Sequence, residues 1–134
     1  FPLYFSMEFN KLIPELSVTD YEKSLAFYKM LGFKVEYTRE NFAFLSLQGS
    51  QLMIEKQNDT WNVGELTKPF GRGINFQIAV NNVEEILSIL KENNYEIAFP
   101  LEVHTYVAND EEFHEKEFLV QDPNGYLLRF SQTL

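Results

Sequence analysis

Apolar and polar residues follow the same pattern in two successive stretches of the chain. In the first stretch, a short run at residues 12–18 precedes apolar residues at Leu25, Tyr28 and Leu31, spaced as on one face of a helix. In the second stretch, a run at residues 74–80 precedes a similar stripe, which consists of Val83, Ile86, Leu87 and Leu90. Each stretch therefore predicts a strand followed by an amphipathic helix.

Local signals mark where the two helices begin and end. Thr19 starts a capping-box pattern, and Asn81 or Asn82 is suited to cap the second helix. Gly32 and Asn94 tolerate the left-handed conformation that ends many helices. Because these signals recur in the same order, we interpret the chain as one unit written twice.

Further strands are predicted after each helix. They lie at residues 33–39, 42–48, 51–56, 96–99, 102–107, 115–121 and 126–132. Asp122-Pro-Asn-Gly125 predicts a tight turn before the last of them, and the acidic segment 108–114 is expected to be a mobile insertion. The pattern thus predicts an α+β fold of two tandem βαβββ modules.

These modules define the expected organisation of the chain. Residues 7–134 are predicted to form a single domain, with module one at about 7–56, a linker loop at 57–73 and module two at 74–134. A linker of this length is often functional. Residues 1–6 resemble a protease-site tag remnant joined to Met7, although they could also be a native N-terminal arm.

Composition excludes several classes of protein. None of the 134 residues is cysteine, which excludes a disulfide scaffold, a thiolate metal site and cysteine catalysis. The formal charge of −9 disfavours nucleic-acid binding, and no apolar run is long enough for a membrane span. We expect a cytoplasmic protein with neither nucleic acid nor membrane as partner.

Several segments resemble the vicinal oxygen chelate superfamily, which includes glyoxalase I, extradiol dioxygenases, fosfomycin-resistance enzymes and bleomycin-resistance proteins. The segments are Pro14-Glu-Leu-Ser-Val-Thr-Asp20, Leu25-Ala-Phe-Tyr28 and Leu31-Gly-Phe33, and the resemblance covers residues 11–132. Residues 61–77 and 118–130 are most similar to the bleomycin-resistance branch. The resemblance implies that the modules form a curved mixed sheet around a concave trough.

Enzymes of this superfamily hold a divalent metal in the trough, with ligands from four strand positions. By resemblance, these positions are Ile13, Glu55, Asn75 and Arg129 in this chain. Ile13 has no donor atom, and the permanent cation of Arg129 cannot bind a metal ion. We therefore expect no metal and no other cofactor, and we hypothesise that Arg129 is the counter-charge of Glu55.

Without a metal, the trough is interpreted as a binding site for a small molecule. Alternation along the strands places Phe42 with Phe44 on one face, and Asn75 with Gln77 on another. Aromatic rings can stack on a ligand, and amides can orient it. The predicted ligand-binding residues are Phe42, Phe44, Glu55, Trp61, Phe70, Asn75, Gln77 and Arg129, with no catalytic and no metal-binding residue. Packing in the core is the alternative for each aromatic residue.

The resemblance implies a homodimer that sequesters a small molecule without chemical conversion. Antibiotic resistance of the bleomycin type, with a cationic glycopeptide as ligand, is the expected function. The alternatives are a metal-dependent or metal-free lyase or dioxygenase of the same superfamily, and a regulatory dimer without a ligand. A metal-free enzyme could use Glu55 as its base.

Overall fold

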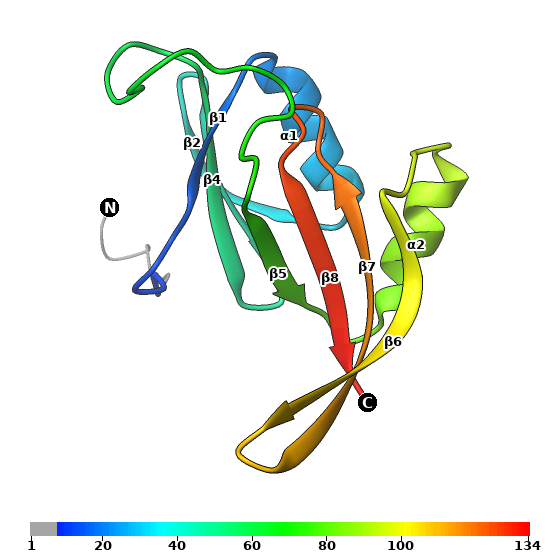
Figure 1. Ribbon diagram of the computed structural model, residues 1–134. Helices are drawn as coiled ribbons and strands as arrows, with labels where there is room; N and C mark the ends of the chain where they lie inside the picture. The colour runs from blue at the N-terminus through cyan, green and yellow to red at the C-terminus, as the bar shows by residue number, and fades with distance from the viewer. Residues whose placement is uncertain (1–7) are drawn as a thin grey trace.

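A computed structural model describes residues 8–134 and confirms the two βαβββ modules (Figure 1). Module one consists of β1 (Glu15–Val18), α1 (Tyr21–Met30), β2 (Lys34–Arg39), β3 (Phe42–Leu47) and β4 (Ser50–Lys56). Module two consists of β5 (Asn75–Ala79), α2 (Val83–Glu92), β6 (Phe99–Ala108), β7 (Glu111–Gln121) and β8 (Leu127–Thr133). The expected tag remnant at residues 1–6 lies outside the described residues.

The two modules have equivalent sheets. Sheet A has the order β1-β4-β3-β2 and sheet B has the order β5-β8-β7-β6. In each, the first strand is parallel to the last and the other pairs are antiparallel, so both sheets are mixed. A helix covers one face of each sheet (Figure 1). Between sheets and helices lies the core, which includes Leu45, Ile54, Leu90, Phe118 and Phe130.

The observed helix ends agree with the predicted repeat, apart from one cap. The backbones of Gly32 and Asn94 both have positive φ, at 103° and 56°, as their predicted roles require. Asn82 caps α2, because its side chain accepts a hydrogen bond from the backbone N–H of Glu84 at 3.1 Å. The cap of α1 is Asp20 and not Thr19: the Asp20 carboxylate accepts from the N–H of Lys23.

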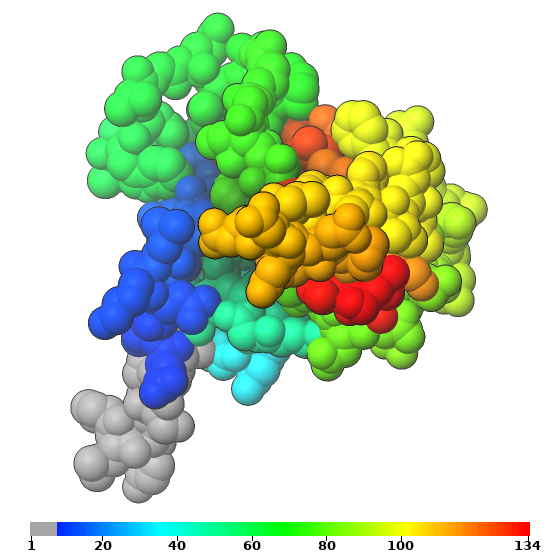
Figure 2. Space-filling model, turned by 60° about the horizontal axis from the view of Figure 1, so that its bottom comes forward, coloured from blue at the N-terminus to red at the C-terminus, as the bar shows by residue number. Residues whose placement is uncertain are grey.

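The acidic segment 108–114, which was expected to be a mobile insertion, lies in a β-hairpin. Asn109 and Asp110 turn the chain with positive φ values of 51° and 66°, and β7 begins directly after them. The predicted strands 96–99 and 102–107 are replaced by the single strand β6, whose pairing shifts between Phe99 and Glu102. The hairpin extends beyond the rest of sheet B (Figures 1 and 2).

Buried hydrogen bonds hold the two modules together. The hydroxyl of Tyr28, on α1, donates to the Asp122 carboxylate at 2.7 Å. Ser24, one turn earlier on α1, donates to the side-chain oxygen of Asn124 at 3.2 Å. The Tyr126 hydroxyl donates to the backbone oxygen of Ser17 at 2.9 Å. Five residues take part in these bonds through their side chains, and we call them the module junction: Ser24, Tyr28, Asp122, Asn124 and Tyr126.

The linker loop packs onto this junction. The backbone N–H of Phe70 donates to the carbonyl of Asn124 at 2.9 Å, and the buried Phe70 ring meets the Tyr126 ring edge-to-face. Gly125 has a φ of 98°, and a Cβ atom there would lie 2.6 Å from the Cα of Pro69. Only glycine therefore allows the turn and the linker to approach this closely.

Candidate functional site

The open face of sheet B contains a hollow of about 300 Å³. Side chains from all four strands line it: Gln77, Tyr106, Phe113, Glu115, Glu117 and Arg129. Pairing places them together, because Arg129 lies opposite Gln77 and Tyr106 lies opposite Phe113. The intervening residues, such as Phe118 and Phe130, point into the core. We call this site the sheet B hollow.

Polar side chains form a connected chain across the sheet B hollow. Arg129 donates from Nη2 to the side-chain oxygen of Gln77 at 2.9 Å. On its other side, Arg129 Nη1 lies 3.7 Å from Oε2 of Glu117, which is an ion pair but too long for a hydrogen bond. The Tyr106 hydroxyl donates to Oε1 of Glu117 at 2.5 Å. Tyr106 therefore orients the carboxylate that faces the arginine.

Two buried side-chain atoms in this hydrogen-bonded network have no hydrogen-bond partner: Oε2 of Glu117 and Nε of Arg129. The Glu117 side chain is only 5% exposed, and the Arg129 side chain is 26% exposed. Buried polar atoms are nearly always paired, so these two unpaired atoms require an explanation. The hydrogen bond to Glu117 raises the pKa of Tyr106, so its hydroxyl remains a donor at neutral pH.

On sheet A, Phe42 and Phe44 are buried apart from the main core cluster, and side chains of the same sheet cover them. The Arg39 guanidinium lies 3.9 Å from the centre of the Phe42 ring, and the Tyr37 ring stacks on Phe44 with 5.3 Å between centres. Both phenylalanines are buried. A ligand would contact them only after one of the covering side chains moved away.

Glu55 and Trp61 form a second polar group, beside sheet A. The indole N–H of Trp61 donates to the Glu55 carboxylate at 3.1 Å, and 40% of Trp61 is exposed. Burial and the nearby Glu55 both raise the pKa of Glu15. An exposed indole held by a carboxylate is suited to contact a flat or cationic ligand.

The structure separates the predicted site residues. Gln77 and Arg129 meet in the sheet B hollow, and Asn75 is exposed on the same strand as Gln77. Phe70 lies in the core, and we leave it out of the proposed site. The hypothesis that Arg129 pairs with Glu55 is replaced by its pair with Glu117, the one carboxylate within 4 Å of it among the described residues.

Sequence reasoning missed Glu117, Tyr106 and Phe113. A signal existed for Glu117, because this carboxylate directly precedes the apolar run Phe118-Leu-Val120. Alternation with Phe118 places Glu117 on the same face as Arg129, once the pairing of β7 with β8 is known. Without that register, an acidic residue within a predicted strand is assigned to the solvent-exposed face.

The donor atoms at the four implied metal positions do not fit a divalent ion. Ile13 offers none, and the Arg129 guanidinium is turned to Gln77 and Glu117. Glu55 and Asn75 would leave a two-ligand site, fewer than divalent ions require. Within residues 8–134, no group of three His, Asp or Glu side chains is arranged to hold a metal.

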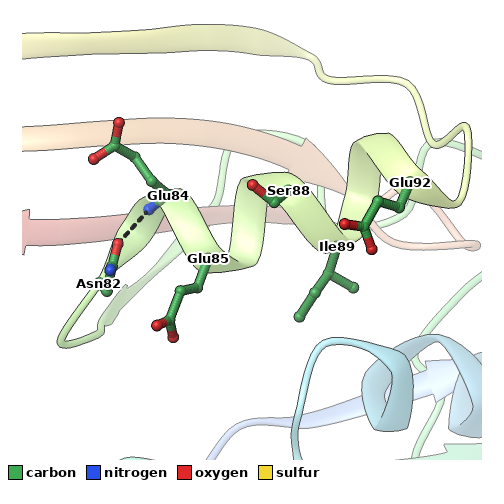
Figure 3. A pocket seen from close by; sticks show the side chains of 6 residues that line it. All are labelled: Asn82, Glu84, Glu85, Ser88, Ile89 and Glu92. Atoms are coloured by element: carbon green, nitrogen blue, oxygen red, sulfur yellow. Dashed lines mark hydrogen bonds between the residues drawn. The ribbon is translucent and has the colours of Figure 1, made fainter.

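A second hollow, of about 480 Å³, lies on α2 and is lined by Asn82, Glu84, Glu85, Ser88, Ile89 and Glu92 (Figure 3). Its carboxylates project from the exposed side of the helix, and Glu84 is bound by Lys116 at 2.9 Å. Asn82 is occupied as the helix cap. This acidic surface lacks the buried, unpaired atoms of the sheet B hollow, and we do not treat it as a binding site.

Comparisons with known proteins agree with this architecture. A family model for the Glyoxalase/Bleomycin resistance protein/Dioxygenase superfamily matches residues 11–130. A search of curated proteins gave no significant match. In the described part of the chain, no helix is long and apolar enough to cross a membrane.

Similar solved structures include TioX from Micromonospora sp. ML1, with 19% identity and a TM-score of 0.70 over 93% of this chain and 99% of that one. A bleomycin resistance determinant encoded on the transposon Tn5 has 18% identity and a TM-score of 0.63, covering 92% and 98%. A superfamily member from Alicyclobacillus acidocaldarius has 18% identity and a TM-score of 0.66, covering 93% and 92%. At such identities, the likeness shows a common fold.

Proposed function

Because the chain belongs to the glyoxalase/bleomycin resistance protein/dioxygenase superfamily, we propose that it is a metal-free protein that binds and sequesters a small molecule. The observation that carries this proposal is the sheet B hollow, where Glu117 and Arg129 each keep a buried polar atom unpaired. The poor donor set at the four metal positions favours binding over metal-dependent catalysis. Sequestration requires tight, stoichiometric binding and no reactive group.

Our specific proposal is antibiotic sequestration of the bleomycin-resistance type. One similar structure is a bleomycin resistance determinant, and a chain with a formal charge of −9 attracts cationic ligands. The proposed contacts combine Glu55 and Trp61 beside sheet A with Asn75, Gln77 and Arg129 on sheet B. Phe42 and Phe44 would join them if the covering side chains move.

Titration with metal-free bleomycin tests this function. Trp61 is the only tryptophan in the chain, so its fluorescence reports on one place. We expect a saturable change at one ligand per chain with submicromolar affinity, and no fluorescence response from Trp61→Phe. If bleomycin causes no change in fluorescence and releases no heat in calorimetry, the bleomycin assignment is contradicted. One equivalent of Ni, Zn, Mn or Fe in protein purified without chelator would favour an enzyme instead.

We further infer that two chains form a homodimer through the β6–β7 hairpin. Val103 and Val107 lie on one face of this protruding hairpin and are 56% and 68% exposed. Apolar residues gathered in this way are typical of a protein interface. Sedimentation analysis should show a dimer, and Val107→Glu should yield monomers. A monomeric parent protein would contradict the inference.

The modular boundaries and the location are proposals of the same kind. We propose one domain at residues 7–134, with module one at 7–56, the linker at 57–73 and module two at 74–134. The boundaries are supported by the end of β4 at Lys56 and the start of β5 at Asn75. We also propose a cytoplasmic location, because a chain without cysteine is suited to a reducing compartment.

A further inference from the structure

The chain segment before β1 packs against the open face of sheet A. Residues 8–10, which form neither helix nor strand, are hydrogen-bonded to the hairpin of β3 and β4. The backbone N–H of Asn10 donates to the side-chain oxygen of Gln51 at 2.8 Å, and the Asn10 amide donates to the carbonyl of Gly49 at 3.0 Å. Gln51 in turn donates to the carbonyl of Glu8 at 2.7 Å. We call residues 8–10 the N-terminal strap.

The N-terminal strap places the ring of Phe9 on Phe44. The centres of the two rings are 5.3 Å apart, and their planes are inclined by 58°. Tyr37 also packs on Phe44, but it does so from the opposite position on the neighbouring strand of the same sheet. Phe44 is fully buried, whereas Phe9 is 46% exposed. Phe9 is therefore a cover that comes from outside the sheet.

The contacts of the N-terminal strap are of a kind that opens at low cost. Its three hydrogen bonds to the hairpin are exposed, and water can replace exposed hydrogen bonds with little loss of free energy. Segments with exposed hydrogen bonds and little buried apolar surface open locally without unfolding the rest of the protein. Because residues 8–10 belong to no strand, their departure leaves every strand pair of sheet A in place.

We propose that the N-terminal strap is an autoinhibitory cover, in which Phe9 occupies the place on Phe44 where an aromatic ring of the ligand binds. This inference rests on the proposed binding function and names the device that controls access to sheet A. Strap and ligand compete for Phe44, so the ligand binds only those molecules whose strap is open. The apparent affinity of the ligand falls in proportion to that fraction.

The ring that replaces Phe9 is uncharged, as Phe9 is. The guanidinium of Arg39 lies 3.9 Å from the centre of the Phe42 ring and 5.7 Å from that of Tyr37. One positive charge therefore already lies against this group of aromatic rings, and it repels a cationic ring brought beside it. Phe9 itself shows that a hydrocarbon ring packs on Phe44.

Displacement of Phe9 by indole, a flat and uncharged ring, tests the proposal directly. Binding is followed by NMR through the ring signals of Phe9 and Phe44 in the parent protein. At millimolar indole, we expect the Phe44 signals to shift and the Phe9 signals to move toward those of an unstructured peptide. Phe9 signals that stay unchanged would overturn the proposal, because indole would then not take the place of the strap.

Variants test whether the strap limits binding. Gln51→Ala removes one acceptor and one donor that hold the strap but keeps the Phe9 ring, so we expect indole to bind about fivefold more tightly. Phe9→Ala removes the cover and should give at least the same gain. Leu12→Ala is the matched control, because this side chain next to the strap is 87% exposed, and it should leave the affinity unchanged.

The comparison between these variants decides the proposal. If Phe9→Ala binds indole more tightly and Gln51→Ala does not, indole only fills the space of the truncated ring, and the strap proposal is wrong. If Gln51→Ala proves unstable, Asn10→Ala replaces it, because this change removes the hydrogen bond to Gly49. Indole affinity equal to that of the parent in Asn10→Ala would then overturn the proposal.

A parallel titration with metal-free bleomycin separates failure of this inference from failure of the proposed function. If bleomycin binds and leaves the Phe9 signals unchanged, the strap proposal is wrong and the binding function stands. If bleomycin does not bind but indole displaces Phe9, the strap proposal stands and the bleomycin assignment is wrong. If neither compound binds, both proposals are wrong.

Discussion

Replacing Asp122 by Ala is expected to lower the free energy of unfolding by about 3 kcal/mol, because several buried hydrogen-bond donors lose their acceptor at once. Asp122 accepts from the Tyr28 hydroxyl at 2.7 Å, and from the backbone N–H groups of Asn124 and Tyr126 at 2.8 and 3.0 Å. The loss therefore affects both the turn and its attachment to α1. Urea denaturation followed by circular dichroism measures the change.

Tyr28→Phe is the matched control for this prediction. It removes one hydroxyl from the module junction and leaves the turn intact, so we expect a smaller loss of about 1 kcal/mol. Equal losses in Tyr28→Phe and Asp122→Ala would show that the turn contributes nothing of its own. No loss in Asp122→Ala would contradict the role that we assign to the module junction.

The pH dependence of stability is an independent test of how the Asp122 carboxyl contributes to the folded state. Burial, the largest cause, raises the pKa of its carboxyl above 3.8, so the folded protein holds this proton more tightly than the unfolded chain. The contribution of this group to stability is therefore fully present below pH 3.8 and is lost as the pH rises through the folded pKa. Asp122→Asn removes this dependence, so the parent should lose stability relative to this variant as the pH rises. A parent that gains stability relative to Asp122→Asn as the pH rises would contradict the prediction.

Replacing Arg129 by Met is expected to lower the free energy of unfolding by about 2 kcal/mol. The change leaves the buried carboxylate of Glu117 without its counter-charge, and removing one partner of a buried pair is costly. We take a value below the usual range because 26% of the Arg129 side chain is exposed to water. Chemical denaturation at neutral pH measures the effect.

A double variant separates this electrostatic cost from lost packing. Arg129→Met combined with Glu117→Leu has neither charge, so we expect it to regain most of the stability lost by Arg129→Met alone. If the double variant is less stable than either single variant, packing in the sheet B hollow dominates. If Arg129→Met has the stability of the parent, Glu117 does not depend on this ion pair.

Much of the fold could be predicted from local patterns. The two apolar stripes and the paired stops at Gly32 and Asn94 were sufficient for two βαβββ modules, because helix period and termination depend on neighbouring residues. The hairpin at 108–114 was not predicted. Its turn residues, Asn109 and Asp110, lack the glycine that usually signals such a turn.

The candidate site was less predictable because it depends on strand register. Alternation correctly placed Gln77 on one face of its strand, but its contact with Arg129 comes from the pairing of β5 with β8. Glu117 reaches Arg129 from β7, because β7 pairs with β8. Such pairings join residues far apart in the chain, and one sequence carries little signal for them.

The module junction has a consequence for the order in which the molecule assembles. Its hydrogen bonds join residues 94 to 109 positions apart, so they close a loop that spans most of the chain. Closing such a loop has an entropic cost, whereas each β-hairpin forms between near neighbours. We therefore expect local hairpins to form early and the junction late, with the meeting of two partly built halves as the rate-limiting step of folding.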